Sequence, residues 1–126
     1  MSQENVELVR RAIEYFGETE RVAVECYDPE IEFTTRSDGP LPRVDGLRRS
    51  VEDFREAWAS TTFKADEFIP KNDAVVVPLL FHLRAQSGVE LDIEEAWVYW
   101  VRNGKIWRME QHASKEEALE AAGPSE

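Results

Sequence analysis

The sequence predicts an α+β fold, a cone-shaped roll in which a curved antiparallel sheet wraps over three N-terminal helices and a short C-terminal helix follows. Helical periodicity is concentrated in the first half of the chain and strand alternation in the second, which is the α+β pattern. Residues 93–112 contain Asn103-Gly104 between two arms rich in β-branched and aromatic residues. This arrangement favours a hairpin with a type I′ turn. With 126 residues and no internal linker, we expect one domain over residues 1–126.

The N-terminal part predicts two helices. Ser2 can cap a helix that runs to Phe16 and ends at Gly17. Apolar residues recur along it at spacings of three or four, at Val6, Val9, Ile13 and Phe16. A short second helix is expected over 20–27, because the proline at position 29 disfavours helix in the residue before it.

Strand alternation begins after that proline. Ile31, Phe33 and Thr35 alternate with polar residues, which predicts a strand with one buried face. Residues 37–45 contain two prolines and are expected to form a loop. A third helix opens at Gly46, and its apolar face consists of Leu47, Val51, Phe54 and Trp58.

The second half predicts four strands in a meander, over residues 62–70, 74–84, 89–101 and 105–112. Pro78 interrupts the second of these strands, so we expect a sheet edge or a β-bulge there. After the last strand, a capping box from Ser114 to Glu117 opens a short helix that ends at Gly123-Pro124.

Charge and composition exclude several classes of protein. The formal net charge is −11, which argues against partners that demand a basic surface, namely nucleic acids and anionic membranes. Cys26 is the lone cysteine and lies in an apolar stretch, so we expect a buried structural thiol and no internal disulfide. The two histidines form no close-spaced ligand pair, and we expect neither a metal nor a cofactor. No segment resembles a signal peptide or a membrane span, which predicts a cytoplasmic protein.

The space between the curved sheet and the helices is expected to bind a small hydrophobic molecule. Its predicted lining is Tyr15, Phe33, Thr35, Phe54, Trp58, Trp97, Tyr99, Met109 and Gln111. Within this set Tyr15, Thr35, Tyr99 and Gln111 would supply polar atoms to an otherwise apolar pocket.

Three residues are candidates for acid–base chemistry in this pocket: Glu95, Glu110 and His112. Glu95 shares strand parity with Trp97 and Tyr99, and a carboxylate among aromatic rings suits a general acid or base. Glu110 precedes His112 by two residues and could orient it. The parity of this last strand is ambiguous. The more apolar residues Trp107 and Met109 could face the pocket instead, and Glu110 and His112 would then lie on the opposite face. Whichever residue moves the proton, Tyr99, Gln111 or Trp97 would stabilise the developing oxyanion.

The opposite parity predicts a second surface. Val98 and Trp100 oppose the pocket-facing set and would be exposed in a monomer. Exposed apolar patches of this kind usually mark interfaces, so we expect a homodimer formed through the outer sheet face. His82 is expected on this surface as well, because its strand buries the alternate set of residues.

Four segments resemble SnoaL-like proteins of the nuclear transport factor 2-like superfamily. They are residues 1–13 (MSQENVELVRRAI), 27–33 (YDPEIEF), 102–106 (RNGKI) and 115–123 (KEEALEAAG). The resemblance implies the cone fold shared by polyketide cyclases, ketosteroid isomerases, epoxide hydrolases, dehydratases and non-catalytic binding modules, and it implies a homodimer. One fold that carries so many activities does not specify a reaction.

Two residue-by-residue comparisons follow from the resemblance. Ketosteroid isomerases use an Asp base and a protonated Asp donor, and Phe33 and Trp97 occupy the matching positions here. The resemblance therefore implies no steroid isomerase activity. SnoaL-type cyclases use an acid late in the last strand, which corresponds to Glu110 or to Gln111.

Two functions remain open at this point. The first is binding of a small ring-containing molecule, with cofactor-free acid–base catalysis of the isomerase, cyclase or hydratase type. The alternative is a non-catalytic module for ligand binding or dimerisation.

Overall fold

The computed structural model describes residues 2–36 and 39–123. In chain order its elements are α1 (Ser2–Thr19), the 3₁₀ helix η1 (Val24–Cys26), β1 (Tyr27–Thr35), β2 (Gly39–Pro42), α2 (Arg43–Ala57), β3 (Ser60–Lys64), β4 (Ile69–Lys71), β5 (Ala74–Arg84), β6 (Glu90–Arg102), β7 (Lys105–His112) and α3 (Lys115–Ala121). Among the helices of these described ranges, none combines the length and the apolar character needed to cross a bilayer.

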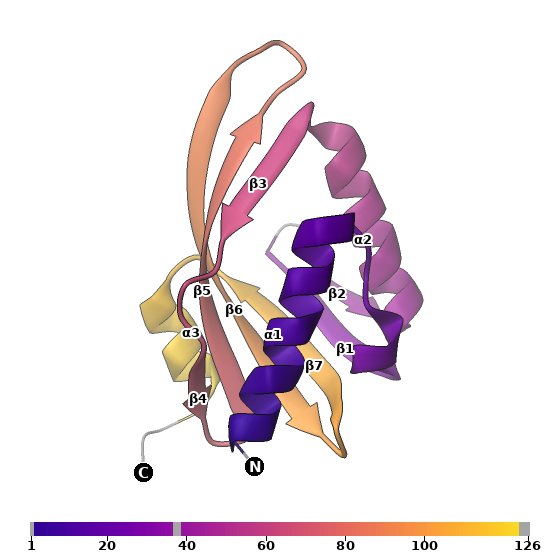
Figure 1. Cartoon of the computed structure of the whole chain (residues 1–126), viewed down its shortest axis with the longest axis vertical. Helices are drawn as coiled ribbons and strands as arrows, with labels where there is room; N and C mark the ends of the chain where they lie inside the picture. The colour runs from indigo at the N-terminus through magenta and orange to yellow at the C-terminus, as the bar shows by residue number, and fades with distance from the viewer. Residues whose placement is uncertain (1, 37–38, 124–126) are drawn as a thin grey trace.

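The strands form one seven-stranded curved sheet in the order β2-β1-β7-β6-β5-β3, with β4 also paired to β5. Helices α1 and α2 cover one face, and α3 packs on the other (Figure 1). The predicted α+β class and cone-shaped roll are confirmed. One pair differs from the expected antiparallel sheet, because β1 runs parallel to β7. Parallel strands need a long connection, which the chain between β1 and β7 supplies.

Helix α1 continues past Gly17 to Thr19, so the predicted end at Gly17 is wrong. A Cβ atom at Gly17 would lie 3.3 Å from Cζ of Phe63, and the glycine therefore permits close packing against β3. Glu20, the residue after the helix, has φ +58° and terminates it, and its N–H donates to the Phe16 carbonyl at 2.7 Å.

The predicted helix over 20–27 is also wrong. Only η1 forms there, and β1 begins at Tyr27 and runs through Pro29. Its register with β7 shifts between Tyr27 and Glu32, and β2 pairs only from Glu32 onward. Proline is tolerated in such a locally unpaired stretch because no ladder hydrogen bond is lost. Cys26 is fully buried, as expected, and burial together with the neighbouring Glu25 raises the pKa of its thiol.

The loop expected over 37–45 contains an edge strand and the start of a helix. β2 pairs with the end of β1 and is an edge strand of the sheet, the kind of strand in which proline is tolerated, and α2 begins at Arg43 instead of Gly46. Ser37 and Asp38 lie outside the described residues. Helix α2 ends before Trp58, whose half-buried side chain follows the helix instead of lying on its apolar face.

The strand expected over 62–70 is divided into β3 and β4, which pair with the two ends of β5. Pro78 lies between these two pairings, while its register with Ala96 of β6 is continuous. The expectation of a sheet edge at Pro78 is thus confirmed, and the alternative of a bulge is not.

The C-terminal third follows the sequence closely. Asn103 and Gly104 have φ values of +55° and +74°, as a type I′ turn requires. Ser114 caps α3 by accepting a hydrogen bond from the Glu117 N–H at 3.2 Å. Helix α3 then covers part of the outer face, so Val98, which we expected to be exposed, is fully buried. It lies in a small core with Ala74, Val76, Ala96, Ala118 and Ala122.

The turn geometry gives a stability prediction. Gly104→Ala forces a Cβ into the left-handed region and should lower the free energy of unfolding by about 1 kcal/mol. Urea denaturation measures the change. Asn103→Gly is the matched control, because glycine adopts the same φ without strain and should leave stability nearly unchanged. Equal stability of Gly104→Ala and the wild-type protein would contradict the assigned turn.

Candidate ligand-binding site

A cavity of about 820 Å³ lies between the sheet and the two long helices. Helix α2 supplies much of one wall, the ends of β1 and β7 supply polar groups, and β5 and β6 supply the floor. The lining is Phe16, Thr35, Arg36, Asp45, Gly46, Arg49, Ser50, Val51, Asp53, Phe54, Phe81, Leu83, Ile93, Glu95, Trp97 and Gln111. A volume of this size accommodates a drug-sized ligand.

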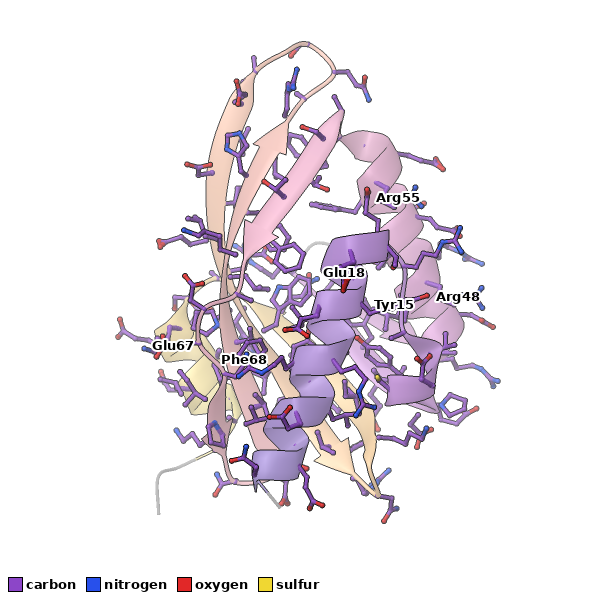
Figure 2. The ribbon with its side chains drawn as sticks, viewed as in Figure 1. Tyr15, Glu18, Arg48, Arg55, Glu67 and Phe68 are labelled. Atoms are coloured by element: carbon purple, nitrogen blue, oxygen red, sulfur yellow. The ribbon has the colours of Figure 1, made fainter. Side chains whose placement is uncertain are left out.

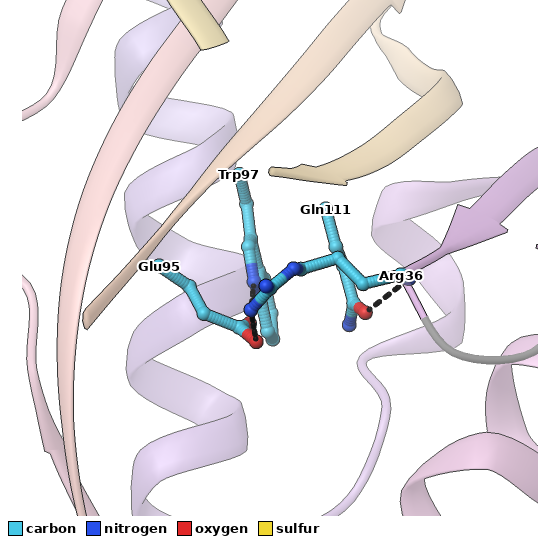
Figure 3. A network of polar contacts seen from close by, with 4 residues as sticks. All are labelled: Arg36, Glu95, Trp97 and Gln111. Atoms are coloured by element: carbon cyan, nitrogen blue, oxygen red, sulfur yellow. Dashed lines mark hydrogen bonds and ion pairs between the residues drawn. The ribbon is translucent and has the colours of Figure 1, made fainter. Parts of the chain in front are cut away.

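Four of these residues form a polar network, which we call the mouth network: Arg36, Glu95, Trp97 and Gln111 (Figure 3). Arg36 Nη1 lies 3.1 Å from Glu95 Oε2, and the Trp97 indole N–H donates to Glu95 Oε1 at 2.8 Å. The backbone N–H of Arg36 donates to Gln111 Oε1 at 3.3 Å. The network therefore joins the end of β1 to its neighbour β7 and, across β7, to β6.

The position of Glu95 follows from strand parity. Odd-numbered residues of β6 face the cavity, so Glu95 lies between Ile93 and Trp97 on the floor. Its side chain is only 19% exposed, and both of its oxygens have a partner in the network. A carboxylate that is largely buried requires such partners.

Beyond the mouth network the cavity is aromatic. The ring centroids of Trp97 and Phe81 are 5.8 Å apart, and those of Phe81 and Phe54 are 6.0 Å apart with the rings nearly perpendicular. These are favourable separations for aromatic pairs. The cavity thus presents an aromatic wall at one end and hydrogen-bonding groups at the other.

Of the residues we predicted for this pocket, the structure places Glu95, Thr35, Phe54, Trp97 and Gln111 in its lining. Three others, Phe33, Tyr99 and Met109, lie in the core beneath the cavity and are almost fully buried. The remaining two, Tyr15 and Trp58, do not line the cavity.

Tyr15 is 39% exposed on α1 and does not reach the cavity (Figure 2). Trp58 lines a separate, polar hollow of about 650 Å³ beside Glu52 and Arg55. The two misplacements have different causes. Tyr15 lies at the exposed margin of the apolar stripe of α1, while its neighbour Phe16 reaches the cavity. Trp58 comes after the end of α2 at Ala57, so helical spacing no longer fixes its direction.

Glu110 and His112 do not face the cavity. They pair with Val98 and Ala96 of β6, whose side chains lie on the outer face. There Glu110 accepts from Arg108 Nη2 at 2.6 Å and bonds His112 Nε2 at 3.0 Å. The register between β6 and β7 shifts between Trp100 and Val101, which pair with Arg108 and Ile106, so Trp107 has no partner in β6. This bulge breaks the alternation of side chains between Trp107 and Met109, which explains why the parity of β7 was ambiguous in the sequence.

The charged part of the lining was not predicted from the sequence. Asp45, Arg49 and Asp53 are spaced four residues apart and therefore share one face of α2, which also carries Phe54. That spacing was the available signal. Arg36, by contrast, gave no signal beyond its place at the end of a strand.

Two tyrosines lie deep in the core below the cavity. Burial raises the pKa of Tyr27 and of Tyr99 well above the ordinary value, and each hydroxyl therefore stays protonated at neutral pH. Among the described residues, no group of three His, Cys, Asp or Glu side chains is arranged to hold a metal ion.

Comparison with known proteins identifies the family. Residues 9–109 match the model of the SnoaL-like domain, and the chain belongs to that family. No curated protein sequence matched the chain.

Solved structures give the same fold. An NTF2-like protein of unknown function from Burkholderia pseudomallei is 19% identical, with a TM-score of 0.79 over 96% of this chain and 98% of its own. TerC, co-crystallised with polyporic acid, is 17% identical, with a TM-score of 0.78 over 94% and 98%. A putative SnoaL-like polyketide cyclase from Jannaschia sp. is 15% identical, with a TM-score of 0.78 over 98% and 94%. At these identities the likeness establishes the nuclear transport factor 2-like fold.

His82 lies on the outer face, as predicted, between two carboxylates. Its Nδ1 is 2.7 Å from Asp92 Oδ1 and its Nε2 is 2.8 Å from Glu90 Oε1. The hydrogen bond to Asp92, followed by that to Glu90, raises the pKa of His82. The protonated cluster therefore stabilises the fold below the unfolded-state pKa of about 6.5, and this contribution is lost as pH rises through the higher folded-state value.

We expect an NMR titration of His82 to give a midpoint above that of an unperturbed histidine. Asp92→Asn should lower this midpoint, because it removes the first of the two charged partners. Glu94→Gln is the control, since Glu94 pairs with Leu80 and should shift the midpoint less. An unchanged midpoint in Asp92→Asn would contradict the cluster geometry.

Proposed function

We propose that this SnoaL-like domain binds a small ring-containing molecule in the cavity between the sheet and α1 and α2. One observation carries the proposal: a single cavity joins an aromatic wall to the mouth network. Pockets for small molecules are mostly apolar, with a few polar groups that fix the orientation of the ligand. The ring system would lie against Phe54, Phe81 and Trp97, and its polar substituent would meet the network.

The mouth network offers both kinds of hydrogen-bonding group. Gln111 uses its carbonyl oxygen for the Arg36 backbone, and its amide nitrogen carries two further donors. Glu95 offers acceptor capacity, since a carboxylate has about four lone-pair sites and the described residues make one bond to each of its oxygens. A phenol or enol substituent, which both donates and accepts, fits this combination.

Acid–base catalysis by Glu95 is the second candidate function. The observation in its favour is that Glu95 comes from the sheet floor, next to the aromatic wall where a ring would lie. The contacts with Arg36 and Trp97 hold the carboxylate in one orientation, as a general base requires. Steroid isomerase activity is not proposed, because Phe33 lies buried beneath the cavity and Trp97 is engaged with Glu95.

The comparisons support a small-molecule role without specifying the ligand. TerC was crystallised with polyporic acid, and another neighbour is described as a putative polyketide cyclase. Both descriptions concern proteins below 20% identity, so the reaction of neither is assigned to this chain.

Binding can be tested with 4-hydroxybiphenyl as a probe, followed through tryptophan fluorescence. We expect saturable binding that Ser50→Trp weakens at least about tenfold, because the added ring fills the cavity. Arg48→Trp is the matched control: Arg48 is on the same helix but points to solvent, as Figure 2 shows, and binding should be unchanged. Equal weakening in both variants, or no binding to the wild-type protein, would contradict the proposal.

The same experiment separates binding from catalysis. A binding protein returns the probe unchanged, and Glu95→Gln should then alter only its affinity. Under the catalytic alternative, exchange of ring protons ortho to the hydroxyl with deuterium should exceed the rate in buffer and fall about a hundredfold in Glu95→Gln. Exchange at the buffer rate with this probe would count against Glu95 as a base.

We also propose that the chain forms a homodimer through the outer sheet face. Although α3 buries Val98, Leu80 remains 41% exposed on this face, and Trp100 is half-buried beneath the Arg108 guanidinium at 4.5 Å. Sedimentation velocity at micromolar concentration should show a dimer, and Leu80→Glu should shift it towards monomer. Glu7→Gln, at an exposed position of α1 and so away from the outer face, is the control. A monomeric wild-type protein would overturn this proposal.

A further inference from the structure

A second hollow lies on the other side of the aromatic wall. This hollow, which we call the α1–β3 groove, has a volume of about 520 Å³ and lies between the second half of α1 and β3. Phe63, Ala65 and Phe68 form its apolar side. Figure 2 shows Phe68 beside α1 and Glu18 near the C-terminal end of that helix.

The groove shares three lining residues with the cavity between the sheet and the two long helices, which we call the cone cavity: Phe16, Phe54 and Phe81. These residues come from α1, α2 and β5, and their rings belong to one series of aromatic contacts between the two spaces. Phe54 and Phe81 meet edge to face at 6.0 Å, and Phe81 contacts Phe63 at 5.7 Å. Phe63 in turn stacks on Phe16 at 5.5 Å.

The partition is less tightly held than a core. Phe16 and Phe54 are only half-buried, since each borders a hollow, whereas Phe81 is almost fully buried. Phe54 also lies near the end of α2, where Asp53 and Arg55 on either side of it are exposed. A side chain without packed neighbours on all sides can change rotamer at low cost.

We propose that the α1–β3 groove is a second compartment of the binding site, which holds the far end of an elongated, multi-ring ligand that passes Phe54. This inference rests on the proposed function, because the near end of the ligand occupies the cone cavity at the mouth network. The aromatic lining of both spaces suits one continuous ring system.

Charge limits the chemistry of the far end. Glu14, Glu18 and Glu20 line the groove, and among the described lining residues Arg10 is the one cation. The Arg10 guanidinium lies 4.4 Å from the Phe68 ring centroid, and Glu20 pairs with Arg55 at 3.3 Å. The groove is therefore acidic, and the end of the ligand that reaches it is neutral or basic and not a carboxylate.

The test compares 4-hydroxybiphenyl with its three-ring homologue 4-hydroxy-p-terphenyl on the full chain, by tryptophan fluorescence. The longer probe should bind about tenfold more tightly, because its third ring is transferred from water into the apolar groove. A carboxylate on that third ring should cancel the gain. A carboxylated probe that binds as tightly as the neutral one would overturn the assignment of a neutral or basic far end.

Two variants locate the third ring. Ala65→Phe fills the groove and should cancel the advantage of the longer probe while leaving the shorter one within about twofold. Asp66→Phe is the matched control, since Asp66 is exposed and does not line the groove. Phe54→Ala widens the passage and should raise the affinity ratio of the longer to the shorter probe.

The outcomes separate the two proposals. If the shorter probe binds and the longer one binds no more tightly, the second compartment is overturned and the proposed function stands. A longer probe that binds more tightly but is unaffected by Ala65→Phe also overturns the compartment. If neither probe binds, the proposed function fails and the compartment fails with it.

Discussion

The register of β6 between β5 and β7 is the constraint on which the rest of this molecule depends. Eleven consecutive residue pairs join β6 to β5, and this long antiparallel ladder fixes the parity of every β6 side chain. Odd-numbered residues such as Glu95 and Trp97 face the cavity, and even-numbered residues such as Ala96 and Val98 face α3. A slip by one residue would exchange the two sets and leave a carboxylate under α3.

The mouth network shows how a polar group is placed in such a sheet at low cost. Glu95 is largely buried, and a carboxylate there would be destabilising without partners. Trp97 supplies one from the same strand, and Arg36 supplies the other from the end of β1. Because β7 lies between β1 and β6, Gln111 completes the link through the Arg36 backbone. The network therefore holds the cavity rim to its floor as well as presenting polar atoms to a ligand.

Features that depend on residues close together in the chain were predicted correctly from the sequence. The Asn103-Gly104 turn, the Ser114 cap and the parity of Glu95 depend on neighbouring residues, and each was accessible from the sequence. Long-range pairing was not, because the alternation in β1 does not show that its partner is β7 or that the pair is parallel. The same limit applies to the site. The irregular register near Trp100 placed Glu110 and His112 outside, and Arg36 became a site residue only through contacts with distant strands.

The position of Pro78 affects how the protein behaves among copies of itself. On one edge of β5, β3 pairs from Leu80 onward and β4 pairs up to Val76, so residues 77–79 have no strand partner on that edge. An open edge of a flat apolar strand is a template onto which a strand from another molecule can add. Proline has no N–H to offer an incoming strand, and its ring obstructs close approach. The gap between β3 and β4 is therefore a poor template for intermolecular β-sheet growth, although it lies within the apolar run of β5.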